Sequence, residues 1–337
     1  MSGAMSPEPS YPYPPAYYLA LVEHAAEPPF ESAHEQVTYW GRAWGARDEV
    51  GPLRAVLMRK LRDEWKVVRE DCWDERCQAL MDPAGRWYWD DRKAPDIARA
   101  QAQQQGLIDA LEAHGVDVHL VEGYDPSHVR AIYTRDPLVT VPGGAILGRL
   151  APTMRKGEER HIHQALGALG VPILRTIHGT GMLEGGSFAK LTPTVAAYST
   201  SIRCNESGAR QLQETLAWLG IELLVVPMGG WSIHLDGHFG MVDVDKALVD
   251  PLGLPWWFLD RLTELGIEQL ICPPGEEWAI NSLCLRPGLV VMCEGYDRSR
   301  ELLEHRGIEV LAIPYDEVQK GGGGIHCSTM ELVRDPA

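Results

Sequence analysis

The sequence contains no long apolar run and no basic residue near its start. Nowhere do eighteen apolar residues occur together, so no helix is predicted to cross a membrane. No lysine or arginine precedes Arg42, and the early apolar segment, residues 16–22, is short and is followed at once by Glu23 and His24. A signal peptide needs a basic start and a separate apolar core. We therefore expect no signal peptide and a soluble, cytoplasmic protein.

Positive charge is also scarce. The 31 lysines and arginines are outnumbered by 47 aspartates and glutamates, which gives a formal net charge of −16. A surface with this balance repels a phosphate backbone or an anionic membrane and attracts small cations. We expect a small-molecule ligand, with neither nucleic acid nor a membrane as partner.

Closely spaced cysteines are absent. The seven cysteines are scattered without the short spacings of a disulfide framework or a zinc site, so reduced thiols are expected. Cys272, Cys284 and Cys293 lie in apolar segments, where a thiol is usually a small buried hydrophobic group. The Gly-x-Ser-x-Gly elbow of the α/β-hydrolases is missing as well, so a serine nucleophile of that kind is not expected.

The N-terminal segment differs in composition from the rest of the chain. Prolines at positions 7, 9, 12, 14, 15, 28 and 29 alternate with tyrosines. This composition predicts an extended tail over residues 1–35. Residues 36–337 are expected to form a single catalytic domain.

From about residue 50 one pattern recurs five times. A stretch of helical character ends at a glycine and a short β-branched run follows; the glycines, at 115, 170, 220, 266 and 307, are 55, 50, 46 and 41 residues apart. Each glycine suits a helix C-cap, with a strand beginning directly after it. Helices are expected at 97–114, 158–169, 208–219, 255–265 and 299–306, and further strands at 53–58, 138–147, 188–198, 239–249 and 283–293.

This alternation predicts an α/β fold. A repeated unit that cannot bury its own apolar face must stack on its neighbours. An ordinary doubly wound sheet also alternates strands and helices, and it stays an alternative. If the five units close around an axis, the loops at one end meet at a central pocket, where a ligand would bind.

Four polar clusters fall in segments that the repeat assigns to the pocket end of its units: residues 133–137, 183–187, 234–238 and 321–329. They supply the thiol of Cys327, an imidazole and three carboxylates. Carboxylates hold a planar cation through its N–H groups, and a thiolate is suited to attack the open central carbon. Four glycines before Cys327 permit close approach of the backbone to a ligand. The pattern predicts Cys327, at the end of the fifth unit, as a nucleophile that attacks a guanidinium carbon.

A metal site is the competing interpretation of the histidines. His234 and His238 are four residues apart, as two zinc ligands on one helix face would be, and His161 and His163 could add ligands. Gly237 disfavours a helix at that point. We therefore expect no metal.

Taken in order, the four clusters resemble the guanidino-group-modifying superfamily, which includes arginine deiminases, dimethylarginine dimethylaminohydrolases, agmatine deiminases and arginine amidinotransferases. The resemblance extends over about residues 44–334 and implies a five-bladed pseudosymmetric α/β propeller of ββαβ units, with neither metal nor organic cofactor. It also implies that Cys327 forms a covalent thiouronium intermediate. His234 would protonate the leaving amine and later activate water, and Glu184 would orient His234.

The resemblance further implies a set of substrate-binding residues. Asp136 and Asp236 would hold the guanidinium nitrogens, and Arg155 and Arg203 would hold an α-carboxylate. Ser187 stands where arginine deiminases often carry aspartate, which is closer to agmatine deiminases.

Three functions remain open on the sequence. The first is a hydrolase that converts a guanidino compound, arginine or an N-substituted arginine, to a ureido product plus ammonia or an amine. The second is an arginine amidinotransferase, because the segment around Cys327 is similar to those enzymes also. The third is a non-catalytic protein that binds a cationic ligand.

Overall fold

The computed structural model describes residues 13–14, 16–17, 20, 32–123 and 125–337. Its α-helices are α2 (Ala33–Trp40), α3 (Ile97–Ala113), α4 (Glu158–Leu169), α5 (Glu206–Trp218), α6 (Trp256–Glu264), α7 (Asp297–Glu304) and α8 (Asp316–Gln319). Short 3₁₀ helices are η1 (Glu64–Val67), η2 (Glu70–Cys72), η3 (Thr153–Arg155), η4 (Gly185–Ser187), η5 (Leu235–Gly237), η6 (Pro251–Gly253) and η7 (Glu277–Ile280). No helix of the described residues is both long and apolar enough to cross a membrane.

Most of the expected N-terminal tail lies outside the described residues. Helix α2 begins at Ala33, inside the span of 1–35 that was expected to be extended. Its start is fixed by a capping box, in which the backbone N–H of Glu35 donates to the Ser32 hydroxyl and that of Ser32 donates to the Glu35 carboxylate. The helix therefore begins at a capping sequence of its own, although the composition of the residues before it predicts an extended chain.

Four three-stranded sheets share one plan. Their strands are β6 (Leu138–Val141), β7 (Gly144–Leu147) and β8 (Ile173–Thr176); β9 (Phe188–Thr192), β10 (Val195–Thr200) and β11 (Glu222–Pro227); β12 (Phe239–Asp243), β13 (Lys246–Val249) and β14 (Glu268–Ile271); and β15 (Leu283–Arg286), β16 (Leu289–Cys293) and β17 (Glu309–Ile313). In each sheet the first two strands are antiparallel, and a helix then leads to a third strand parallel to the second. The runs expected as strands at 138–147, 188–198, 239–249 and 283–293 are thus hairpins.

The fifth sheet of this kind joins the two ends of the domain. Strand β1 (Leu53–Met58) pairs in parallel with β5 (Asp117–Leu120) and antiparallel with the C-terminal strand β18 (Met330–Arg334). The segment that carries Cys327 therefore leads into the sheet of the first unit. The expectation that Cys327 ends the fifth unit is corrected, because β18 takes the hairpin position beside β1.

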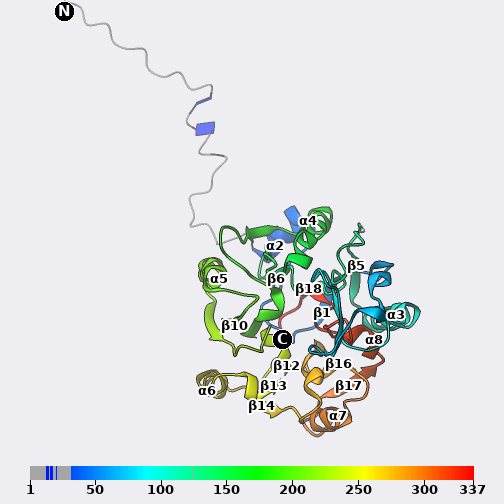
Figure 1. Cartoon of the computed structure of the whole chain (residues 1–337). Helices are drawn as coiled ribbons and strands as arrows, with labels where there is room; N and C mark the ends of the chain where they lie inside the picture. The colour runs from blue at the N-terminus through cyan, green and yellow to red at the C-terminus, as the bar shows by residue number, and fades with distance from the viewer. Residues whose placement is uncertain (1–12, 15, 18–19, 21–31, 124) are drawn as a thin grey trace, which may run out of the picture.

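The helices lie outside the strands. Figure 1 shows α3, α4, α5, α6 and α7 at the periphery, with the strands of the five sheets nearer the middle of the molecule. The helices are held by their apolar faces; Leu107 and Leu111 of α3, for example, are fully buried. The chain leaves α4 at Gly170, whose φ of 76° is the left-handed conformation of a helix C-cap. These features give a mixed α/β fold.

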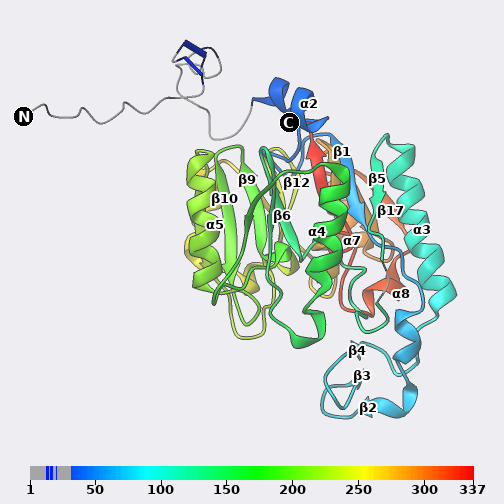
Figure 2. The ribbon, with the colours of Figure 1, turned by 90° about the horizontal axis from the view of Figure 1, so that it is seen from above.

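A sixth sheet interrupts the regular plan. Strands β2 (Trp73–Asp74), β3 (Ala79–Met81) and β4 (Tyr88–Trp89) form a small antiparallel sheet between β1 and α3. Figure 2 shows it at the end of the molecule opposite α2. The five-fold pattern in the sequence did not predict this insertion.

A buried ion cluster connects strands β18 and β9 with the segment that precedes β6. Glu331 of β18 accepts contacts from Arg135 at 2.6 Å and from Lys190 of β9 at 2.8 Å, and Lys190 also pairs with Glu49 at 2.9 Å. All four side chains are less than 10% exposed. Arg135 lies one residue before Asp136, and its backbone N–H donates to the carbonyl oxygen of Cys327 at 3.0 Å. This cluster therefore ties the segment of Asp136 to the segment of Cys327.

Candidate active site

Five polar side chains stand just before the strands that begin the five antiparallel pairs. They are Asp136 before β6, Glu184 before β9, His234 before β12, Asn281 before β15 and Cys327 before β18. Glu184 and His234 are the N-cap residues of η4 and η5. Because equivalent positions of the units face the same end of the fold, residues far apart in the sequence converge.

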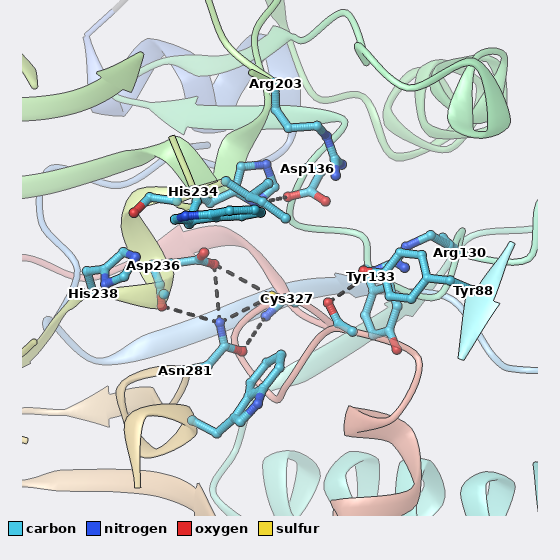
Figure 3. Close-up of a pocket in the computed structure, with 16 residues that line it drawn as sticks. Tyr88, Arg130, Tyr133, Asp136, Arg203, His234, Asp236, His238, Asn281 and Cys327 are labelled. Carbon is cyan, nitrogen blue, oxygen red and sulfur yellow. Dashed lines mark hydrogen bonds and ion pairs between the residues drawn. The ribbon is translucent and has the colours of Figure 1, made fainter. Parts of the chain in front are cut away.

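The point of convergence is a cavity of about 220 Å³. Five residues that the sequence predicted for the site line this cavity: Asp136, Arg203, His234, Asp236 and Cys327. Asn281, which the sequence did not predict, lines it as well. Figure 3 shows these side chains around the position of Cys327. Glu184 is fully buried behind His234.

The thiol of Cys327 is 9% exposed and faces polar neighbours. Asn281 donates through Nδ2 to its Sγ at 3.2 Å, and the Asn281 Oδ1 accepts from the backbone N–H of Cys327, also at 3.2 Å. The Asp236 carboxylate lies 3.7 Å from Sγ. Burial raises the pKa of the Cys327 thiol well above its usual value, and the charges of Asp236 and Asp136 raise it further. Without a cation beside it, this thiol stays protonated at neutral pH.

His234 is held between two carboxylates. Its Nε2 lies 2.7 Å from Oε2 of Glu184, and its Nδ1 lies 3.6 Å from Oδ1 of Asp136. Burial opposes protonation of the ring, but the charge of Asp136 and the hydrogen bond to Glu184 outweigh burial and raise the pKa of His234. Burial favours the neutral acid of Glu184, yet the bond to His234 keeps its pKa below the usual value. The imidazole is therefore poised to carry a proton.

Arg203 reaches the same carboxylate from the other side. Its Nη2 lies 2.6 Å from Oε2 of Glu184, and its Nε donates to Oε1 at 3.0 Å. The backbone N–H of Ala151 donates to Oε1 as well. Arg203 lines the cavity and is 12% exposed at its side chain, so it can meet a ligand while it holds Glu184.

Arg155 does not line the cavity. Its side chain is 1% exposed and pairs with Asp136 and, at 2.7 Å, with Glu158. Two carboxylates already neutralise this guanidinium, and the fold covers it. The expectation that Arg155 holds a substrate carboxylate is therefore corrected: it holds Asp136.

Burial favours the neutral acid of Asp136, but the charges of His234 and Arg155 outweigh burial and lower the pKa of this carboxyl. Asp136 thus stays ionised, and its Oδ1 has no hydrogen-bond partner among the described residues.

Asp236 is the second carboxylate at the thiol. Its Oδ2 contacts Nδ1 of His326 at 2.9 Å and accepts from Nδ2 of Asn281 at 3.3 Å. The backbone N–H of His326 donates to the carbonyl oxygen of Asn281. The residue before the thiol thus fixes the carboxylate beside it.

Asn281 is the residue that the motifs alone missed. The repeat contained the signal, since polar residues precede the strands at 138, 188 and 239, and Asn281 occupies the same place before 283. An amide does not ionise, so it gives no signal in a pattern made of thiol, imidazole and carboxylate groups. His326 lies within the cluster 321–329, for which the sequence predicts a role at Cys327 only.

The group most suited to a metal among the described residues is Asp136, Glu184 and His234, whose ligand atoms lie within 4.8 Å of one another. Those atoms already contact each other and the arginines Arg155 and Arg203. His238 lines the cavity, but its Nδ1 lies 2.8 Å from Asp250. His238 does not belong to the group of potential ligands that contains His234.

Two family models match consecutive parts of this chain. The model of the family described as "N,N dimethylarginine dimethylhydrolase, eukaryotic" matches residues 85–251, and the model "Arginine deiminase" matches residues 262–334. A 2-nitroimidazole nitrohydrolase from Mycobacterium sp. is 25% identical over 272 residues, which cover 73% of this chain and 71% of that protein.

The N(G),N(G)-dimethylarginine dimethylaminohydrolase of Pseudomonas aeruginosa is 25% identical over 238 residues, 71% of this chain and 90% of its own. A solved structure of that enzyme complexed with citrulline has a TM-score of 0.66 at 22% identity, over 83% of this chain and 99% of the other. An amidinotransferase of the saxitoxin biosynthetic pathway from Microseira wollei has a TM-score of 0.69 at 15% identity, over 87% and 98%. Both structures share the mixed α/β fold.

The class that fold and matches define is an enzyme that modifies guanidino groups. The chain belongs to the guanidino-group-modifying superfamily, as its motifs predicted. The family models that match are those of hydrolases, whereas the fold is shared with amidinotransferases as well.

Proposed function

We propose that this protein is a cysteine-dependent hydrolase that converts a guanidino compound, arginine or an N-substituted arginine, to a ureido product and ammonia or an amine. The observation that carries the proposal is the thiol of Cys327 at a cavity with two carboxylates and a histidine–glutamate pair. Each of these groups supplies one requirement of the reaction.

The first requirement is to hold a flat cation. Oδ1 of Asp136 is buried, ionised and without a hydrogen-bond partner in the described part of the chain, and Asp236 lies 3.7 Å from the thiol sulfur. Guanidinium N–H groups that donate to both carboxylates would place the central carbon beside Sγ. Arg155 contributes by holding Asp136 in place and not by contact with the substrate.

The second requirement is a thiolate. The bound guanidinium offsets the negative charges of Asp236 and Asp136, which raise the pKa of Cys327 in the free enzyme. Asn281 donates to the sulfur and favours its anion. Substrate binding and thiol ionisation are therefore coupled, and a neutral ligand of the same shape would not activate the nucleophile.

The third requirement is proton delivery. The Cys327 thiolate forms a C–S bond to the guanidinium carbon, and the C–N bond breaks as His234 gives its proton to the leaving amine. His234 then takes a proton from water, and the resulting hydroxide attacks the thiouronium carbon. The C–S bond breaks as the hydroxyl proton passes to the departing sulfur, which releases the neutral ureido product and restores the Cys327 thiol and protonated His234. Glu184 holds the ring through Nε2 and stabilises its protonated form. Arg203 positions Glu184 and can meet a substrate carboxylate.

Transfer of the amidino group to an amine is the second candidate, supported by the likeness in fold to the Microseira wollei amidinotransferase. The two reactions share the thiouronium intermediate and differ in whether water or an amine resolves it. Arginine would be supplied with and without candidate amines. Hydrolysis predicts citrulline and ammonia without an amine, whereas ornithine formed only with an amine would favour transfer.

An intact-mass experiment tests the nucleophile itself. The parent protein is mixed with a panel of guanidino compounds and quenched with acid within seconds, and a covalent mass increase is expected on the peptide of Cys327. Cys327→Ser should give neither the increase nor turnover, while Cys77→Ser, at an exposed thiol, should give both. Turnover by Cys327→Ser at the parent rate would refute the assignment. Binding of guanidino compounds without turnover by the parent would instead favour a binding protein.

The arrangement of the sheets supports a proposal for the whole domain. We propose that the five three-stranded sheets form a five-bladed α/β propeller, with β18 and β1 closing the ring, and that residues 36–337 act as one catalytic domain. Four of the five equivalent residues line one cavity and the fifth, Glu184, contacts His234 from behind, which supports this view.

A further inference from the structure

One charged side chain at the cavity has no role in the reaction above. Arg130 is 6% exposed and lines the cavity. Its Nη2 donates to the carbonyl oxygen of Gly322 at 3.0 Å. Its Nε and Nη1 are buried and have no hydrogen-bond partner among the described residues.

The other two arginines of the site are neutralised by carboxylates. Arg155 pairs with Asp136 and Glu158, and Arg203 pairs with Glu184. Arg130 has no carboxylate within ion-pair distance in the described part of the chain. Removing a charge from water without a partner costs several kcal/mol. A bound anion is one of the partners that account for such a group in a native fold.

Two tyrosines fix the direction in which this guanidinium points. The Arg130 carbon Cζ lies 4.2 Å from the ring centroid of Tyr88 and 5.4 Å from that of Tyr133. Figure 3 shows the three side chains together on one side of Cys327, with Asp236 on the other. Tyr88 comes from β4 of the inserted sheet, so that sheet contributes to the cavity. Aromatic faces contribute about 0.5–2 kcal/mol to a cation, which does not replace its hydration.

The chain also leaves little room around this group. A Cβ on Gly322 would lie 2.4 Å from the Tyr88 hydroxyl and 2.7 Å from Arg130 Nη2, and the backbone there has a φ of 87°. A glycine is therefore required where the loop before Cys327 passes the arginine. The loop that leads to Cys327 therefore packs directly against the guanidinium of Arg130.

From these observations we propose that Arg130 binds a carboxylate of the substrate, so that the enzyme selects guanidino carboxylic acids over guanidines with a neutral or cationic tail. The proposal rests on the proposed function and names its substrate class. The guanidinium is held by Asp136 and Asp236, and the acid is held by Arg130, which gives the cavity an anionic and a cationic side. A terminal amine would instead place a second cation beside Arg130.

Three substrates of equal length test the selection: 4-guanidinobutyrate, butylguanidine and agmatine. A charge-assisted hydrogen bond contributes about 1.5–3 kcal/mol, which corresponds to roughly 10- to 100-fold in kcat/KM. The parent should therefore favour the acid over butylguanidine by about this factor, with agmatine lowest. Arg130→Gln should bring the ratio of acid to butylguanidine close to one. The matched control is Arg286→Gln, at an exposed arginine 3.9 Å from Glu309, which should keep the parent ratio.

Equilibrium binding separates this proposal from the reaction itself. Calorimetry on Cys327→Ala measures the same three compounds without chemistry, and tighter binding of the acid in this protein, lost when Arg130→Gln is added, supports the proposal even if turnover fails. Equal binding of the three compounds, or an unchanged ratio in Arg130→Gln, overturns it. If Arg130→Gln does not fold, Tyr88→Leu removes the ring that orients the cation and should lower the ratio; an unchanged ratio there would count against the proposal. Failure of the proposed function would show separately, as absence of turnover and of any adduct on Cys327.

Discussion

The sharpest test of the site concerns Asn281, which carries no charge. Its Nδ2 donates to Sγ of Cys327 at 3.2 Å, so it should stabilise the thiolate more than the thiol. A hydrogen bond to a charged group contributes about 1.5–3 kcal/mol, and about 1.4 kcal/mol corresponds to a factor of ten. Asn281→Ala should therefore lower the thiolate fraction of Cys327 by roughly 10- to 100-fold at a given pH.

Asn281→Asp should have a larger effect in the same direction. It keeps the size of the side chain and places a carboxylate oxygen where the donor was. A unit charge at the 3.2 Å of the present contact raises the energy of a thiolate by about 5 kcal/mol at an effective dielectric constant of ~20. Partial protonation of the new acid reduces this figure, but the order of reactivity should be parent, alanine variant, aspartate variant.

The assay is alkylation by iodoacetamide, followed residue by residue with mass spectrometry over a range of pH. The exposed thiol of Cys77 and the half-buried thiol of Cys72 serve as controls within the same molecule, because both lie outside the cavity. The rate at Cys327 should fall in the variants while the rates at Cys72 and Cys77 stay unchanged. A smaller side chain at position 281 also opens the cavity around the thiol. Easier access would raise the plateau of the alkylation rate at high pH but would not move the midpoint of the curve of rate against pH. An unmoved midpoint at Cys327 in both variants would refute the reasoning.

Three further outcomes are expected. Glu184→Gln should lower the pKa of His234, because its bond to the ring favours the protonated form, and should reduce kcat by about 10²-fold; ring titration by NMR and steady-state rates measure both. Arg155→Met should destabilise the fold by about 3–5 kcal/mol in denaturant titrations, because it leaves Asp136 buried without its cation. Burial favours the neutral acid of Glu331, but the charges of Arg135 and Lys190 outweigh burial and lower its pKa well below 4.5. Its contribution to stability is therefore full above that pH and is lost as the pH falls through the folded value, and Glu331→Gln should flatten the acid limb of the unfolding midpoint against pH.

Each of these outcomes has a control and a contradicting result. Arg286→Met, at an exposed ion pair, should change stability by less than about 1 kcal/mol, and an equal loss in both arginine variants would contradict the role of burial. A His234 titration that does not move in Glu184→Gln would remove the link between the two residues. If the unfolding midpoint of Glu331→Gln falls with decreasing pH as steeply as that of the parent, a group other than Glu331 causes the sensitivity to acid.

The sequence predicted the superfamily and much of the secondary structure. Strand 53–58 and helix 158–169 were placed with their observed bounds, because their apolar periodicity and terminal glycine are local signals. The inserted sheet at β2–β4 and helix α2 were not predicted. Strands β2–β4 have only two or three residues each, which is too short for a periodic pattern. The cap at Ser32 is a local signal, but it follows a proline-rich segment that predicts an extended chain.

The candidate nucleophile Cys327 and its candidate partner His234 were also predicted from the sequence, since both lie in motifs that are short and contiguous. Which arginines line the cavity is decided by the tertiary structure alone. The fold brings two carboxylates to Arg155, whereas none of the described residues brings one within ion-pair distance of Arg130. Whether the charge of an arginine is neutralised depends on which side chains from distant units lie within a few ångströms of it. These distances are set by the folded chain and cannot be inferred from the residues next to the arginine in the sequence.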